Sequence, residues 1–172
     1  MSKKALTLAL LLLVSGFAGC ATDDEKSEKT ATPAASATPT PEPQVFYEKG
    51  FFDEERDRDL TWRWMSEEGV IRLKNPKRDA VLKIKGNVPK DRFPKPPTIT
   101  IKLNGEQLDQ FPAPTEPTEK VYNIPAARLG NGDFAELTIS SSKIFIPKEV
   151  DKNSTDPRHL SFSLQGLTWE AR

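Results

Sequence analysis

The strongest constraint on the fold lies in residues 45–172, where short alternating runs of apolar and polar residues are separated by prolines. Alternation is typical of a β-strand with one buried face, because successive side chains leave opposite faces of a sheet. Proline cannot donate a backbone hydrogen bond within a sheet, so the prolines mark the connections between strands. The predicted strands are 60–65, 70–74, 80–86, 120–124, 134–142, 143–146 and 160–170, with a hairpin over 98–111.

That hairpin is the clearest local signal, because Asn104-Gly105 stands between its two alternating runs. Asn-Gly is the preferred pair for a two-residue type I′ turn, which needs two residues in left-handed conformation. No segment shows an apolar period of about 3.6 residues sustained over three helical turns. The sequence therefore predicts an all-β domain over residues 45–172, an antiparallel β-sandwich of jelly-roll-like arrangement.

The N-terminal residues have a different composition. Lys3 and Lys4 precede an apolar stretch that is shorter than the about 20 residues of a membrane-spanning helix, so residues 1–19 are predicted to be a signal peptide. Residues 20–44 are rich in alanine, threonine, serine and proline and contain nothing that could build a core. We expect this segment to be a disordered linker, extended by its prolines.

Cys20 is the only cysteine, and it follows Phe17-Ala18-Gly19. These residues resemble the lipobox of bacterial lipoproteins, although phenylalanine stands where leucine is usual. The resemblance implies cleavage before Cys20 and attachment of a diacylglycerol to its thiol; the alternative is an ordinary secretory signal with an incidental cysteine. In two-membrane cells an aspartate after the lipidated cysteine retains such proteins on the inner membrane. Ala21 occupies that position, so we expect an outer-membrane anchor, with the domain on the periplasmic face or the cell surface.

Charge and residue inventory argue against several function classes. Lysine and arginine number 25, as do aspartate and glutamate, and no basic stripe runs along the chain, so nucleic acid is not an expected partner. His159 is the only histidine and has no cysteine near it, so we expect no catalytic site, cofactor or zinc site. The acidic run 53–59 is interleaved with Arg56 and Arg58, which favours a solvated loop over a calcium site.

Trp62 and Trp64 are the first candidates for ligand binding. They lie two apart on a predicted strand, so both side chains are expected on the same face of the sheet. If that face is exposed, the two rings form a stacking platform for sugars. If that face is buried, the two rings are a pair of core residues. This second alternative is favoured, because Leu60 extends the same face.

Arg63, Asp156 and Arg158 are the second set of candidates. In the functional interpretation they form a polar cleft for an anionic ligand or a glycan, since guanidinium groups bind carboxylates bidentately. In the structural interpretation they form an internal salt bridge that pins a loop to the sheet.

Four stretches of the domain carry a second resemblance. They are "GFFDEE" (50–55), "WRWMSEEGVIRL" (62–73), "ITIKLNGE" (99–106) and "IFIPKEV…DPRHLSFSL" (144–164). Their order is similar to that of an uncharacterised bacterial β-sandwich domain, which occurs alone in secreted proteins and beside membrane glycosyltransferase regions. Ser161 stands where that domain has a glycine. The resemblance implies a sandwich like that of carbohydrate-binding modules and no established activity.

Two functional hypotheses follow from these observations. In the first, a lipid-anchored envelope protein binds a glycan or another small polar ligand through Trp62, Arg63, Trp64, Asp156 and Arg158. In the second, the sandwich is a structural or protein-interaction module of the envelope, and the lipid only localises it. Burial of the two tryptophans discriminates between them.

Overall fold

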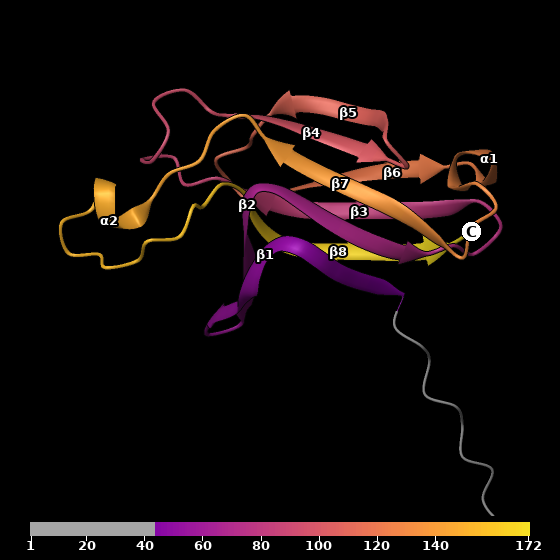
Figure 1. Ribbon diagram of the computed structural model, residues 1–172, viewed down its shortest axis with the longest axis horizontal. Helices are drawn as coiled ribbons and strands as arrows, with labels where there is room; N and C mark the ends of the chain where they lie inside the picture. The colour runs from indigo at the N-terminus through magenta and orange to yellow at the C-terminus, as the bar shows by residue number, and fades with distance from the viewer. Residues whose placement is uncertain (1–43) are drawn as a thin grey trace, which may run out of the picture. The chain divides into compact units, whose positions relative to one another are not determined.

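The computed structural model describes residues 44–172, and the predicted signal peptide, Cys20 and nearly all of the predicted linker lie outside the described residues. Eight strands, every pair antiparallel, form one continuous sheet, so the predicted all-β class and antiparallel arrangement are confirmed (Figure 1). The strands are β1 (Val45–Asp57), β2 (Leu60–Lys74), β3 (Ala80–Asn87), β4 (Thr98–Leu103), β5 (Glu106–Pro112), β6 (Thr118–Ile124), β7 (Phe134–Ser141) and β8 (Ser163–Ala171). Two one-turn helices, α1 (Ala126–Leu129) and α2 (Pro147–Val150), lie in the connections.

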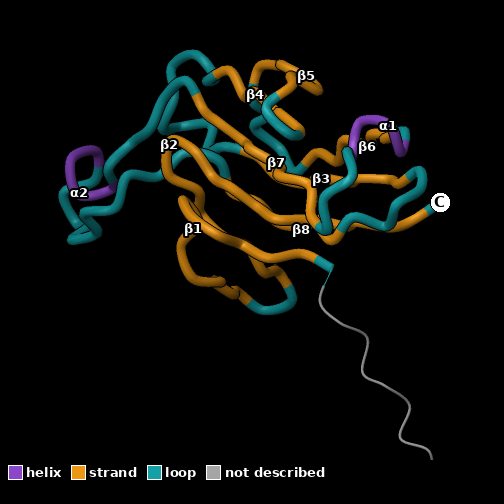
Figure 2. Tube along the Cα trace, turned by 45° about the vertical axis from the view of Figure 1, so that its right-hand side comes forward, coloured by secondary structure: helices purple, strands orange, loops and turns teal. Residues whose placement is uncertain are grey.

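The long strand β2 joins the two halves of the sheet. Its C-terminal part pairs with β7 over Glu68–Lys74, whereas its N-terminal part pairs with β8 at Arg63 and Trp64. The strand order is β5-β4-β7-β2-β8-β3-β6, with β1 pairing along β2 as well. The sheet curls about β2, so its two halves pack face to face as a sandwich (Figure 2).

Side chains close the sandwich where the sheet ends. Asp109 of β5 accepts hydrogen bonds from Lys120 Nζ at 2.6 Å and from the Tyr122 hydroxyl at 2.9 Å, both on β6. Lys120 Nζ also lies 3.9 Å from the centre of the Phe111 ring. The two terminal strands of the sheet are thus held together by an ion pair and a cation–π contact.

The core between the halves follows the predicted alternation. Its fully buried side chains come from both halves, among them Ile71 and Leu73 of β2, Leu82 of β3 and Ile101 of β4. Trp169 of β8 is also buried, and its indole nitrogen donates to the carbonyl of Lys74 at 2.8 Å.

Two buried polar side chains satisfy backbone groups of the loops. The Asn75 amide donates to the carbonyls of Leu129, Gly130 and Gly132 at 3.2, 3.0 and 2.9 Å. Ser161 is fully buried, and its hydroxyl donates to the carbonyls of Met65 and Ser66.

Some element predictions were wrong. The predicted strand 143–146 contributes only an isolated bridge between Phe145 and Leu160, because Pro147 starts α2 directly afterwards. The run 53–59, interpreted as a loop, is mainly the end of β1 and its hairpin turn. The strands predicted at 60–65 and 70–74 are one strand, since pairing with β1 and β7 carries β2 through the polar residues between them. The turn at Asn104 and Gly105 is confirmed, with φ of 51° and 82°.

Candidate functional site

Trp62 and Trp64 line two different clefts. Both side chains are half-buried, so neither alternative of the prediction describes them fully. Trp64 packs against the edge of the core and meets the buried Phe145 edge-to-face, with ring centres 5.9 Å apart. Trp62 lines a smaller cleft together with Arg63. The two rings therefore do not form one continuous stacking platform.

The larger cleft, here called the Trp64 cleft, has a volume of about 410 Å³. It lies between β1, β2 and the loops that precede β4 and β8. Its apolar wall holds Trp64 and Phe145, and charged side chains line the remainder. The lining residues are Glu55, Trp64, Pro89, Asp91, Arg92, Phe145, Pro147, Asp151, Ser154, Asp156, Arg158 and Leu160.

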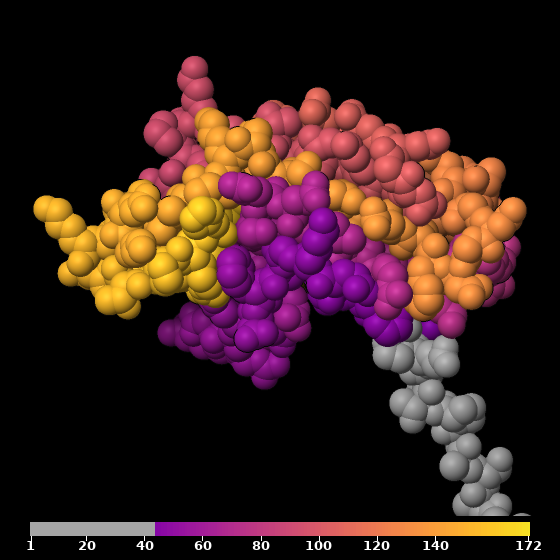
Figure 3. Space-filling model, viewed as in Figure 1, coloured from indigo at the N-terminus to yellow at the C-terminus, as the bar shows by residue number. Residues whose placement is uncertain are grey.

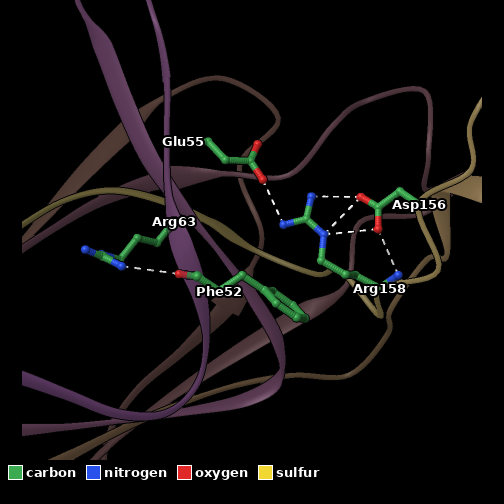
Figure 4. A network of polar contacts seen from close by, with 5 residues as sticks. All are labelled: Phe52, Glu55, Arg63, Asp156 and Arg158. Carbon is green, nitrogen blue, oxygen red and sulfur yellow. Dashed lines mark hydrogen bonds and ion pairs between the residues drawn. The ribbon is translucent and has the colours of Figure 1, made fainter.

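Arg158 is the centre of the polar network in this cleft (Figure 4). Its Nε donates to both carboxylate oxygens of Asp156 at 3.0 Å, its Nη2 donates to Asp156 at 2.8 Å, and its Nη1 donates to Glu55 at 2.8 Å. The guanidinium also lies 5.1 Å from the centre of the Phe52 ring. Arg158 therefore links the loop before β8 to Glu55 of β1.

The ion pair shifts the titration of both partners. Hydrogen bonds from the Arg158 side chain lower the pKa of Asp156, and the same bonds, with those to Glu55, raise the pKa of Arg158. Both groups are charged throughout the physiological range. The loop is consequently fixed in place at neutral pH, and the wall of the cleft is pre-organised.

The charges around the Trp64 cleft disfavour an anionic ligand. Four carboxylates and two guanidinium groups line it. Each nitrogen of Arg158 donates to Asp156 or Glu55, and Arg92 lies 3.4 Å from Asp91 and 3.8 Å from Asp151. An anionic ligand would have to displace these carboxylates, so the cleft offers little for the anion considered from the sequence.

Arg63 does not join Arg158. Its guanidinium donates to the carbonyl of Phe52 at 3.3 Å, lies 3.8 Å from a Glu54 oxygen and stacks over the Tyr47 ring at 4.9 Å. In Figure 4 it extends away from the Arg158 network. The structure thus brings Asp156 and Arg158 together with Trp64 and places Arg63 with Trp62 in the other cleft.

Sequence reasoning missed several residues of the Trp64 cleft. Glu55 is one of several acidic residues in the run 53–59, and nothing in the sequence distinguishes it from the others. Phe145 lies in the segment 143–146, which the sequence predicts to be a strand. Arg92 and Asp151 are in two different loops, and only the folded structure brings these loops together at the cleft. Figure 3 shows the orange-to-yellow atoms of the loop before β8 beside the purple atoms of β1 and β2. The ion pair between Glu55 and Arg158 is part of this contact.

Two further observations bear on function. Among the described residues no group of three or more histidine, cysteine, aspartate or glutamate side chains is arranged to hold a metal ion. Within residues 44–172 no helix has the length and apolar character that crossing a bilayer requires.

Comparison with known proteins gives no family. No family model and no curated protein matches the sequence. Among solved structures, a family 35 carbohydrate binding module from an environmental isolate is similar at 12% identity and a TM-score of 0.43, over 74% of this chain and 93% of the module. A family 35 module from Clostridium thermocellum has 12% identity and a TM-score of 0.37, over 76% of this chain and 90% of its own. The secreted serine protease VesC from Vibrio cholerae has 11% identity and a TM-score of 0.38, over 68% of this chain and 22% of the protease.

Proposed function

We propose that this protein is a lipid-anchored, non-catalytic component of the bacterial cell envelope that binds a neutral glycan or a similar polyhydroxylated ligand in the Trp64 cleft. One observation carries the binding proposal: a half-exposed indole and a fixed set of charged groups line the same cleft. Its volume of about 410 Å³ falls within the about 300 to 1,000 Å³ of small-ligand pockets.

The chemistry of the cleft suits a sugar. An aromatic ring supplies a flat apolar surface for one face of a pyranose. Carboxylate and guanidinium groups at the rim, held in place by one another, can bond to hydroxyls with little loss of side-chain entropy. Asp156 and Arg158, with Trp64, are the binding residues in this proposal; Trp62 and Arg63 belong to the second cleft.

The anchor rests on the N-terminal sequence. Cys20 with its lipobox-like context, followed by a proline-containing segment up to the start of β1 at Val45, supports attachment to a membrane through lipid. Ala21 favours the outer membrane over the inner. A Cys20→Ser variant is expected to lose the lipid and to leave the membrane fraction on carbonate washing. Retention of that variant in the membranes would refute the anchor without touching the binding proposal.

The binding experiment is calorimetric titration of the purified full-length lipoprotein in detergent with a panel of neutral and uronic acid oligosaccharides. Neutral members of the panel are expected to bind, and Trp64→Ala is expected to abolish binding in the Trp64 cleft, which lowers the measured stoichiometry or affinity. Trp64→Phe, which keeps the packing against Phe145, should retain part of it. Val121→Ala on β6, at a side chain that is 52% exposed outside both clefts, is the matched control. Binding of unchanged affinity and stoichiometry in a folded Trp64→Ala variant would reject this cleft.

One observation supports the second hypothesis, a structural or protein-interaction module. Every donor nitrogen of Arg158 already has a partner within the chain, which is what a purely structural loop clamp requires. If no glycan binds, capture of envelope proteins by the lipidated chain, with Trp64→Ala as the comparison, would distinguish an interaction role.

A further inference from the structure

The second cleft forms where β2 and β8 separate. These strands pair only at Arg63↔Leu164 and Trp64↔Ser163, so the next residues, Trp62 and Gln165, do not pair with each other, and both line the space between the strands. This space, here called the Trp62 cleft, has a volume of about 190 Å³. Tyr47 and Glu54 of β1, Thr61, Trp62 and Arg63 of β2 and residues 164–167 of β8 line it.

Gln165, which lines this cleft, lies at a β-bulge. On the other side of β8, Gly166 pairs with Lys85 and Leu164 pairs with Gly86, so Gln165 is an extra residue without a partner on β3. A bulge bends a strand and re-aims a side chain, and such irregularities are common beside binding sites. Strand geometry therefore opens the cleft and directs a polar side chain to it.

Two buried polar atoms, each on a residue that lines this cleft, have no hydrogen-bond partner among the described residues. They are the indole nitrogen of Trp62, a donor, and the Oε1 of Gln165, an acceptor, and residues 44–172 supply no partner for either. Burying such a group without a partner costs about 1 to 3 kcal/mol, so native proteins leave few of them unpaired.

The orientation of the Gln165 amide is fixed by its neighbours. Asn87 donates through Nδ2 to the carbonyl of Thr115 at 3.2 Å, so its Oδ1 must act as an acceptor. Gln165 Nε2 donates to that oxygen at 2.9 Å. The oxygen of the Gln165 amide is therefore the atom left over, and exchanging the two ends of the amide would place two donors or two acceptors against each other.

A hydroxyl group complements this pair, because one hydroxyl can accept from Trp62 Nε1 and donate to Gln165 Oε1. The other groups in the cleft add further partners without net charge. Arg63 and Glu54 balance each other, and burial raises the pKa of Tyr47, against the opposing effect of the Arg63 charge, so its phenol stays protonated at neutral pH.

We infer that the Trp62 cleft is a binding site for a neutral polyhydroxylated group, such as one pyranose ring, in which a ligand hydroxyl bridges Trp62 Nε1 and Gln165 Oε1. This site is separate from the Trp64 cleft, so it goes beyond the proposed function and does not depend on it. A single water molecule occupies only about 30 Å³ of liquid volume, and the cleft is several times larger.

Tryptophan indole signals test the inference directly. The sequence has three tryptophans, so the ¹⁵N–¹H spectrum of the full-length chain in detergent holds three indole signals, assigned through Trp62→Phe and Trp64→Phe. The probes are neutral methyl glycosides and inositol. The Trp62 signal is expected to shift saturably with at least one probe. The Trp169 signal should stay fixed, because that indole donates to the carbonyl of Lys74 inside the core.

The outcomes separate the two proposals. A shift of the Trp64 signal alone would overturn the Trp62 site and leave the proposed function standing. A shift of the Trp62 signal alone would support the Trp62 site and count against binding in the Trp64 cleft. No shift of the Trp62 signal with any probe up to solubility, which is the result for ordered water only, also overturns it.

Variants then test the two hydrogen bonds. Trp62→Phe removes the N–H and keeps a ring, and Gln165→Met removes the amide and keeps its length. Each is expected to weaken the affinity by about five- to tenfold, the effect of one hydrogen bond. Ligand binding to Gln165→Met is measured from the shift of the Trp62 indole signal, and binding to Trp62→Phe is measured from the shift of the Gln165 side-chain amide signal. Val121→Ala is the control. An unchanged Trp169 indole signal shows that each variant is folded. Unchanged ligand affinity in both variants would refute the bridging hydroxyl.

Discussion

Glu55 and Arg158 are 103 residues apart in the sequence and form an ion pair at 2.8 Å. Glu55 belongs to the stretch 50–55 and Arg158 to the stretch 144–164, two of the four that resemble an uncharacterised bacterial domain. Phe52, from the first stretch, lies beneath the Arg158 guanidinium as well. Two sequence signals that had no evident connection therefore describe one structural element, the attachment of the loop before β8 to the hairpin of β1 and β2.

This attachment is expected to contribute a modest coupling free energy. Both side chains are about one-third exposed, which screens the interaction. In a double-mutant cycle with Glu55→Gln and Arg158→Met, urea unfolding should give an interaction of about 0.5 to 1 kcal/mol. Arg158→Met alone should cost more, since Asp156 also loses its partner. Strict additivity of the two single variants would show that the pair does not hold the loop.

The seam between β5 and β6 is expected to make stability sensitive to acid. Hydrogen bonding from Lys120, and then from Tyr122, lowers the pKa of Asp109 below its ordinary 3.8, despite the opposing effect of burial. A carboxylate with a lowered pKa stabilises the folded state above its unfolded pKa, and this contribution is lost as pH falls through the folded value.

Asp109→Asn should therefore lower the free energy of unfolding at pH 7 and flatten its decline below about pH 4. Urea titrations at a series of pH values measure both effects. Asp133→Asn, at a side chain that is 88% exposed, is the comparison. Parallel pH profiles of Asp109→Asn and the native chain would contradict the assignment.

Asn75 is expected to be one of the most sensitive positions of the fold. Its amide donates to three loop carbonyls, and its Oδ1 accepts from the Lys77 amide at 2.9 Å. Asn75→Ala should destabilise the protein by about 2 to 3 kcal/mol, because the loop carbonyls, of which that of Leu129 is buried, lose this donor. Asn75→Asp, of the same shape, should cost more, since it turns an acceptor toward those carbonyls. Equal stability of the aspartate variant and the native chain in thermal unfolding would exclude this role.

Gly50 is expected to tolerate no side chain. Its φ is +76°, and a Cβ at this position would lie 1.7 Å from the carbonyl oxygen of Glu68 on β2. Gly50→Ala should therefore cost more than about 2 kcal/mol, or prevent folding. Gly132→Ala is the matched control, because its nearest contact would be an ordinary 3.4 Å. A melting temperature of Gly50→Ala within error of that control would contradict the close approach.

The predictable part of this fold is the part in which one face of a strand is buried along its whole length. β3, β4 and β7 alternate without interruption, and the Asn104-Gly105 turn is a local signal, so both were found. β1 escaped prediction because three register shifts along β2 break its alternation, and its second half is an edge strand of charged residues.

The candidate site was only partly predictable, because its geometry depends on where the backbone pairing between neighbouring strands ends. Trp62 and Trp64 follow the rule for alternate residues, yet β2 pairs with β8 at Trp64 and parts from it at Trp62. The bulge at Gln165 likewise has no signature in the sequence. Separation of the two tryptophans into two clefts follows from these non-local features.

The closure between β5 and β6 has a consequence for self-association. Each of these strands ends the sheet, and an unpaired strand edge is a template on which other chains can grow into fibrils. Asp109 and Lys120 place half-buried charges along both edges, so an incoming strand would have to strip an ion pair of its partner before it could extend the sheet. The same contact that closes the sandwich therefore also opposes the addition of further strands to the sheet.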